Sequence, residues 1–103
     1  MSLPLLQKNK YQIIQIGENY NINAVTKQTE TLFAEGQHHL IYDCKKLEYI
    51  DSAILSNLVS LLKTAKQNSG SIGLIVNQDI KKIIGDSLVH SIFALYNAVE
   101  EIK

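Results

Sequence analysis

The feature that most constrains this fold is the stretch LEYIDSAILSNLVSLL, residues 47–62, where strand-like character changes directly into helical spacing. An apolar run ends at Asp51 and Ser52. Beyond it, apolar residues recur every three or four positions, which predicts an amphipathic helix. Its expected buried face comprises Leu55, Leu58, Val59, Leu62 and Ala65, and its exposed face Ser56, Ser60, Lys63 and Lys66.

The same alternation continues on both sides of this stretch. The sequence predicts strands over residues 11–18, 38–44, 71–76 and 90–95. Helices are expected over residues 24–36, 51–70, 79–87 and 97–102, with Gly36 and Gly70 as C-terminal caps, a stop near Gly85 and a start at Asn97. This order predicts a single α/β domain with a mixed, mostly parallel sheet of about four to five strands and about four helices, joined by right-handed crossovers.

Composition limits the classes of partner. The chain has 103 residues, of which 46% are hydrophobic, so we expect one domain spanning residues 1–103. Ten Lys and Arg residues balance ten Asp and Glu residues. This balance gives no general attraction to nucleic acid or to an anionic membrane, so neither direct nucleic-acid binding nor membrane insertion is expected.

The N-terminal residues and the cysteine content indicate a cytoplasmic protein. The segment MSLPLLQKNK has too few apolar residues for a signal-peptide core, and no apolar run approaches the roughly 18 residues that a membrane span requires. Cys44 is the only cysteine and therefore forms no internal disulfide, in keeping with a reducing compartment. We interpret Cys44 as a small buried thiol at the end of a strand.

The junction at Asp51 and Ser52 is the strongest candidate site. In α/β domains the turn after a strand and before a helix is where ligands and partners meet the fold. Asp51 has the position and chemistry of a helix N-cap, a role worth about 1 kcal/mol. Ser52 then has two readings, either an ordinary first-turn residue or a hydroxyl placed for modification.

Other polar residues point to no metal site or cofactor. His38 and His39 are adjacent on a strand edge and therefore point to opposite faces, so we expect exposed polar residues rather than ligands. His90 has no evident partner, and the Lys81 and Lys82 pair is expected on a solvated helix face.

An enzymatic reading has little support in the sequence. A small phosphotransfer domain needs several carboxylates at strand ends, and Asp43 and Asp51 alone are too few. We therefore expect a non-enzymatic protein.

The segment LEYIDSAILSNLVSLLKTAKQNSGSIGLIV resembles the hallmark segment of the STAS domain, the anti-sigma factor antagonist family. In that family an apolar strand leads to Asp-Ser, an apolar helix, a glycine turn and another strand. The likeness extends upstream to IIQIGE and downstream to NQDIKKIIGDSLVHSIFALYNAVEEI, and so covers nearly the whole chain. Its one compact motif is Asp51-Ser52.

The resemblance implies a regulatory switch. The best-known members of the family bind a serine kinase that is also an anti-sigma factor, and so release a sigma factor and regulate transcription. The kinase phosphorylates the serine after the aspartate, here Ser52, and a phosphatase reverses the change. The implied partners are therefore an anti-sigma factor kinase and a phosphatase, with the chain itself a monomer or weak homodimer. The implied partner-binding residues are Tyr20, Asn21, Asp51, Ser52, Ala53 and Ile54.

Three positions depart from the family pattern and keep an alternative open. Ala53 replaces a common Ser or Thr, Ile54 a usual Gly, and Tyr20 a usual Asp after the early Gly-Glu turn. We expect Ile54 to project from the first helical turn and to add bulk where a kinase approaches. That expectation suits a permanent interface, as in a STAS subunit docked on the ATPase of an ABC-type lipid transporter, or an atypical module without phosphorylation.

Overall fold

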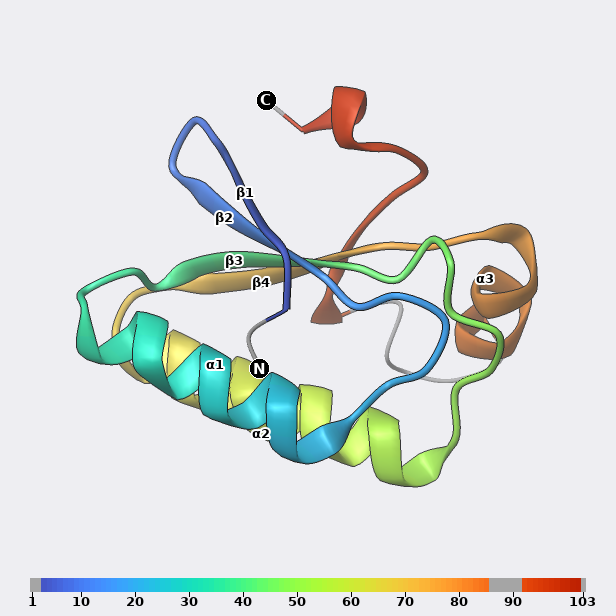
Figure 1. Cartoon of the computed structure of the whole chain (residues 1–103), viewed down its shortest axis with the longest axis horizontal. Coiled ribbons are helices and arrows are strands. Elements are labelled where there is room, and N and C mark those ends of the chain that lie inside the picture. The colour runs from blue at the N-terminus through green and yellow to red at the C-terminus, as the bar shows by residue number, and fades with distance from the viewer. Residues whose placement is uncertain (1–2, 86–91, 103) are drawn as a thin grey trace.

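The computed structural model describes residues 3–85 and 92–102. Elements follow in an order close to the predicted one (Figure 1). They are β1 (Leu5–Lys8), β2 (Tyr11–Gln15), α1 (Ile22–Ala34), β3 (His39–Asp43), α2 (Ser52–Gln67), β4 (Ser71–Ile75), α3 (Gln78–Gly85), β5 (Ala94–Tyr96) and a 3-10 turn, η1 (Val99–Glu101).

The strands form one five-stranded sheet in the order β1-β2-β3-β4-β5. β2, β3, β4 and β5 run parallel to one another, and β1 pairs antiparallel with β2. Helices α1 and α2 lie side by side along one face of the sheet, and the C-terminal segment lies on the opposite side (Figure 1). The predicted α/β class with a mixed, mostly parallel sheet is confirmed.

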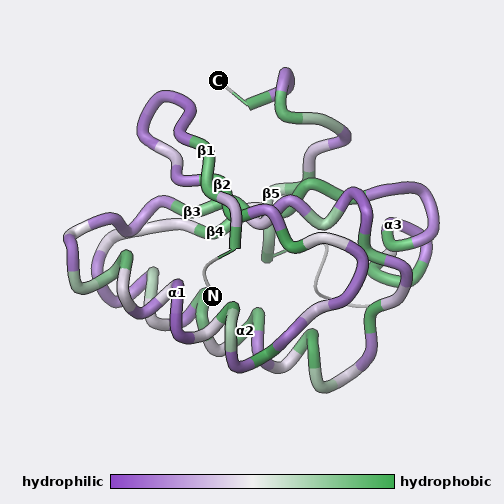
Figure 2. The backbone as a smooth tube through the Cα atoms, in the orientation of Figure 1, coloured by the Kyte–Doolittle hydropathy of each residue, from purple (hydrophilic) through white to green (hydrophobic). Residues whose placement is uncertain are grey.

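Successive side chains along the strands point to opposite faces of the sheet, so the core has two parts. Ile14, Leu40 and Leu74 are fully buried on the helical side, where they join the apolar faces of the helices. Hydrophilic and hydrophobic segments alternate along α1 and α2, as expected of helices with one buried face (Figure 2). On the other side, a smaller cluster holds Ile13, Ile41, Ile75 and Ile102.

The strand β1 was absent from the predicted elements. It follows Pro4 and turns back into β2 through Asn9, whose φ of 56° is in the left-handed region. Leu5 and Leu6 remain largely exposed because β1 is an edge strand. Its pairing with β2 therefore depends on neighbouring backbone rather than on a local hydrophobic pattern.

Two predictions about helices were wrong, one about the last helix and one about the C-terminal cap of α2. The helix expected over residues 97–102 is only the 3-10 turn η1, and its N-cap residue Ala98 makes no side-chain capping bond. Ile102 instead packs on the sheet, and Lys8 Nζ donates to the Val99 carbonyl (3.0 Å). At the end of α2 the left-handed residue is Ser69 (φ 60°), not Gly70. A Cβ on Gly70 would lie 2.1 Å from the His38 carbonyl oxygen, so glycine is required there for close packing.

The face that α2 buries is rotated from the predicted one. The buried residues are Ile54, Leu58, Leu61, Leu62 and Ala65, whereas Leu55 and Val59 are half-buried at the edge of the contact. The helix carries two adjacent apolar stripes, and the packing against the sheet selects the one that begins at Ile54. The cap predicted at Gly36 is confirmed, since Gly36 adopts φ 85° after α1. The described part of α3 is Gln78–Gly85, and residues 86 and 87 of the helix predicted over residues 79–87 lie outside the described residues. Part of the strand expected over residues 90–95 lies outside the described residues, as does His90.

Candidate functional site

The N-terminus of α2 has the geometry predicted for the Asp51-Ser52 junction. Asp51 is the N-cap, with an extended backbone, and its Oδ1 accepts the backbone N–H of Ile54 (2.9 Å). Ser52 is the first helical residue, and Asp51, Ser52 and Ala53 are all exposed. The cap is thus supplied by Asp51, and the Ser52 side chain is accessible from solvent.

A chain of side-chain hydrogen bonds lies behind this surface. Tyr20, in the loop between β2 and α1, donates its hydroxyl to Asn57 Oδ1 (2.6 Å), and Asn57 Nδ2 donates to Thr26 Oγ1 (2.8 Å). This network joins the start of α1 to the second turn of α2. One signal for it is visible in the sequence: Asn57 is an amide directly before the apolar pair Leu58 and Val59. Its importance was missed.

Two predicted contact residues belong to the core rather than to the surface. Ile54 is 2% exposed and Tyr20 is 8% exposed. The expectation that Ile54 projects from the first turn is therefore wrong, because the helix rotation turns this position toward the sheet. Asn21 is exposed, and its Oδ1 caps α1 by accepting the Ala24 N–H (3.0 Å). The exposed members of the predicted set are Asn21, Asp51, Ser52 and Ala53.

Two loops meet next to this surface. The Glu48 N–H donates to the Glu18 carbonyl (3.2 Å), which joins the segment before α2 to the segment before α1. Tyr49 follows with half of its surface exposed. Asn77 Nδ2 donates to the carbonyls of Lys45 and Leu47 and so fixes the beginning of the same segment. The segment that leads into the exposed N-terminal end of α2 is therefore held in place by hydrogen bonds.

Buried hydroxyl and thiol groups below the surface are held in their neutral forms. Burial is the main cause that raises the pKa of Tyr20, and nearby Tyr42 and Cys44 add to it. Burial also raises the pKa of Tyr42, partly offset by its 2.7 Å hydrogen bond with Thr29 Oγ1. Burial, and to a smaller extent the nearby Asp43 carboxylate, raises the pKa of the Cys44 thiol to about 12. Cys44 is 1% exposed, which confirms the interpretation as a buried thiol.

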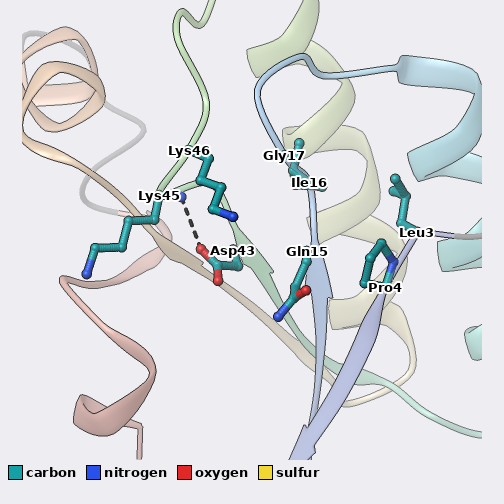
Figure 3. A pocket seen from close by; sticks show the side chains of 8 residues that line it. All are labelled: Leu3, Pro4, Gln15, Ile16, Gly17, Asp43, Lys45 and Lys46. Carbon is teal, nitrogen blue, oxygen red and sulfur yellow. Dashed lines mark hydrogen bonds between the residues drawn. The ribbon is translucent and has the colours of Figure 1, made fainter.

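A separate cavity of about 310 Å³ lies at the carboxyl ends of β2 and β3 (Figure 3). Its lining includes Gln15, Asp43 and Lys46, with Leu3 and Pro4 on the opposite wall. Asp43 Oδ1 accepts the Lys45 N–H (3.0 Å), so this carboxylate also stabilises the turn after β3. Asp51 does not line the cavity, so the two carboxylates considered for a phosphotransfer site do not share it.

The histidine pair is engaged in packing. His38 stacks on Phe33 with ring centroids 5.6 Å apart, and His39 Nδ1 lies 3.0 Å from Ser71 Oγ. Both residues are half-buried, so the expectation of exposed side chains was wrong. The described residues contain no group of three or more His, Cys, Asp and Glu side chains placed to hold a metal ion. Lys81 and Lys82 are exposed on α3, as predicted.

Across residues 3–85 and 92–102, none of the helices combines the length and hydrophobicity that a membrane crossing requires.

Comparison with solved structures places this fold among similar domains. An anti-sigma factor antagonist from Mycobacterium paratuberculosis aligns with a TM-score of 0.81 at 13% identity, over 97% of this chain and 88% of the other. A candidate anti-sigma factor antagonist from Thermotoga maritima aligns with a TM-score of 0.80 at 19% identity, over 96% of this chain and 89% of the other. A STAS domain protein from Planctomyces limnophilus aligns with a TM-score of 0.75 at 15% identity, over 98% of this chain and 94% of the other.

Sequence comparison gives the family directly. A search of curated proteins found no match. The family model for the STAS domain matches residues 19–102, which include α1, α2, α3 and the parallel strands β3, β4 and β5, whereas β1 and β2 precede the match. The chain belongs to the STAS domain family.

Proposed function

We propose that this chain is a non-enzymatic, cytoplasmic regulator of the anti-sigma factor antagonist type. It binds an anti-sigma factor that is also a serine kinase, and phosphorylation of Ser52 releases that partner until a phosphatase removes the phosphate. The observation that carries the proposal is the exposed Ser52 at the first position of α2, directly after the N-cap Asp51, in a chain of the STAS family.

The division of roles between Asp51 and Ser52 supports a switch that leaves the fold intact. The cap bond to Ile54 is made by Asp51, so modification of the Ser52 hydroxyl breaks no capping bond. The N-terminal N–H groups of a helix lack intrahelical acceptors and carry partial positive charge, which favours an anion at this end. A phosphate on Ser52 is therefore compatible with the helix.

The same phosphate opposes binding. It adds about −1.5 to −2 charges at pH 7 beside the Asp51 carboxylate. A partner that covers this surface must remove water from both anions, and any acidic group on the partner is repelled. Affinity falls although the structure of the chain is retained.

The proposed contact surface consists of Asn21, Asp51, Ser52 and Ala53, all exposed. Tyr20 and Ile54 act beneath it rather than in it. The hydrogen bond from Tyr20 to Asn57 fixes the loop that carries Asn21 against α2. Burial of Ile54 also removes the bulk that was expected to hinder a kinase.

The lipid-transporter alternative loses its particular support. It depended on an exposed apolar Ile54 that a permanent partner would bury, and Ile54 is already buried within this chain. No described feature favours it over the regulatory switch.

Binding and phosphorylation assays with serine substitutions test the proposal. The probes are the serine-kinase anti-sigma factors of the native organism, each titrated against wild type, Ser52→Ala and Ser52→Asp. We expect Ser52→Ala to bind like wild type and to resist phosphorylation, and Ser52→Asp to bind at least tenfold more weakly. Ser56 is also exposed on α2, one turn later, so Ser56→Ala is the matched control and should still be phosphorylated. Equal binding by Ser52→Ala and Ser52→Asp would contradict the switch.

A further inference from the structure

The cavity at the carboxyl ends of β2 and β3, here called the strand-end cavity, combines apolar and charged lining (Figure 3). Its apolar wall consists of Leu3, Pro4 and Ile16, and the remaining lining is polar or glycine. The volume of about 310 Å³ lies at the lower end of the roughly 300–1,000 Å³ that ligand pockets occupy. The cavity therefore suits a small molecule rather than a large cofactor.

Two polar side chains of the cavity come from paired strand ends. Gln15 and Asp43 are the last residues of β2 and β3 and lie opposite each other in the parallel register. Each lies two residues after an isoleucine of the smaller core cluster, so both side chains are on that face of the sheet. Both are half-buried. The register thus brings an amide and a carboxylate to the same edge of the cavity.

These two groups have hydrogen-bonding capacity left for a ligand. Asp43 Oδ1 accepts the Lys45 N–H (3.0 Å), and in the described part of the chain no hydrogen bond uses Asp43 Oδ2. Over the same residues the Gln15 side chain makes no hydrogen bond either. Half-buried polar groups usually find hydrogen-bond partners, so a ligand in the cavity would complete their bonding.

Charges of opposite sign line the cavity without pairing. The Lys46 ammonium group points into the space beside Asp43 and Gln15, whereas that of Lys45 points away from it (Figure 3). Among residues 3–85 and 92–102, neither Asp43 nor Lys46 takes part in an ion pair. A ligand with a single charge is attracted by one of these groups and repelled by the other. A ligand with both charges complements both groups.

Both sides of the cavity are held in place by hydrogen bonds. On one side, Gln28 of α1 accepts the Leu3 N–H (2.7 Å) and donates to the Leu3 carbonyl (3.0 Å). On the other side, Asn77 Nδ2 donates to the Lys45 carbonyl (2.9 Å). The cavity is therefore largely formed in the free chain, which lowers the entropy cost of binding a ligand.

We propose that the strand-end cavity binds a free aliphatic α-amino acid of about the size of leucine. Its ammonium group lies against Asp43 Oδ2 and its carboxylate against the Lys46 ammonium, with the Gln15 amide beside them. Its side chain packs on the apolar wall, which contains no aromatic ring. Both charges of the ligand are carried by one carbon atom, which distinguishes a free amino acid from the end of a peptide.

NMR titration of the isotopically labelled chain with L-leucine tests the proposal. We expect shifts of the backbone N–H signals of Gly17, Lys45 and Lys46, which line the cavity. Two analogues keep the side chain with one charge only: 4-methylpentanoate lacks the ammonium group, and 3-methylbutylamine lacks the carboxylate. Each should bind more weakly by roughly tenfold or more. Glycine keeps both charges without the side chain and should also lose roughly tenfold or more.

Matched variants test the two charged groups. Asp43→Asn keeps an oxygen for the Lys45 N–H and should weaken leucine binding by roughly tenfold or more. Lys46→Gln should weaken it by roughly two- to fivefold, because this lysine is exposed. Lys45→Gln makes the same change at an adjacent exposed lysine whose ammonium group points away, and it should bind like wild type. The spectrum of each variant without ligand checks that it is folded.

Four results would overturn the proposal: no shift with leucine at tens of millimolar, 4-methylpentanoate or 3-methylbutylamine binding as tightly as leucine, equal weakening by Lys45→Gln and Lys46→Gln, or shifts confined to residues outside the cavity. The comparison of leucine with its analogues uses wild type alone, so it decides the matter even where a variant fails to fold. Neither Ser52 nor a kinase takes part in these measurements, so they stand apart from the proposed function.

Discussion

The hydroxyl of Tyr20 donates to Oδ1 of Asn57 over 2.6 Å, and this bond joins the loop before α1 to the second turn of α2. The exposed residues of the proposed surface come from the same loop and from the first turn of the same helix, with its N-cap. The geometry of the surface therefore depends on a hydrogen bond that lies beneath it.

Tyr20→Phe should lower the free energy of unfolding by about 1 kcal/mol, because Asn57 Oδ1 loses its donor in a partly buried position. Urea denaturation measures the change. Tyr49→Phe is the control, because half of Tyr49 is exposed; it should change stability by less than about 0.5 kcal/mol. Equal effects of the two substitutions would show that the Tyr20 hydroxyl contributes nothing specific.

Asp51→Ala should destabilise the chain by about 1 kcal/mol, since the Ile54 N–H loses its capping acceptor. Asp51→Asn keeps a side-chain oxygen at the cap and should retain most of the stability. Thermal unfolding of the three proteins at one pH provides the comparison. An alanine variant as stable as wild type would mean that the cap bond is not formed in solution.

Ile54→Ala should destabilise by roughly 2–5 kcal/mol, as expected when a buried branched side chain is removed from a packed core. Ala53 is its exposed neighbour, so Ala53→Gly should cost only the difference in helix propensity, about 1 kcal/mol or less. Chemical denaturation separates the two. A small effect of Ile54→Ala on stability would mean that Ile54 projects into solvent, as the sequence analysis expected.

The Cys44 thiol should resist alkylation in the folded chain at pH 8 and react rapidly once the chain is unfolded. Its pKa is about 12 in the fold against an ordinary value of 9.0, so little thiolate exists at that pH. The raised pKa contributes stability that is complete below about pH 9 and is lost as the pH rises toward 12. Alkylation rates with and without urea test the prediction, and fast reaction of the folded chain would contradict it.

Local pattern was sufficient for much of the fold. Asp51 was identified as a cap because an acidic residue directly precedes the helical repeat, and β3 and β4 because they are short apolar runs bounded by polar residues and glycine. These features depend on neighbours in sequence, so they could be read from the sequence.

The remaining features depend on contacts between distant segments. The choice between the stripe at Ile54 and the stripe at Leu55 is made by the sheet, since both have helical spacing. The strand β1 exists because β2 pairs with it, and the last turn is shaped by packing of Ile102 on the opposite face of the sheet. The hydrogen bond between Tyr20 and Asn57 joins residues 37 apart in the sequence, so no local pattern predicts it.

The phosphorylation state of Ser52 in bound and free protein tests the central claim most directly. The chain is isolated from its native cells, separated into partner-bound and unbound fractions, and the peptide that contains Asp51 and Ser52 is analysed by mass spectrometry. The account predicts unmodified Ser52 in the bound fraction and a phosphate on Ser52 in the unbound fraction. The same phosphate content in both fractions, or a phosphate on Ser56 instead, would contradict it.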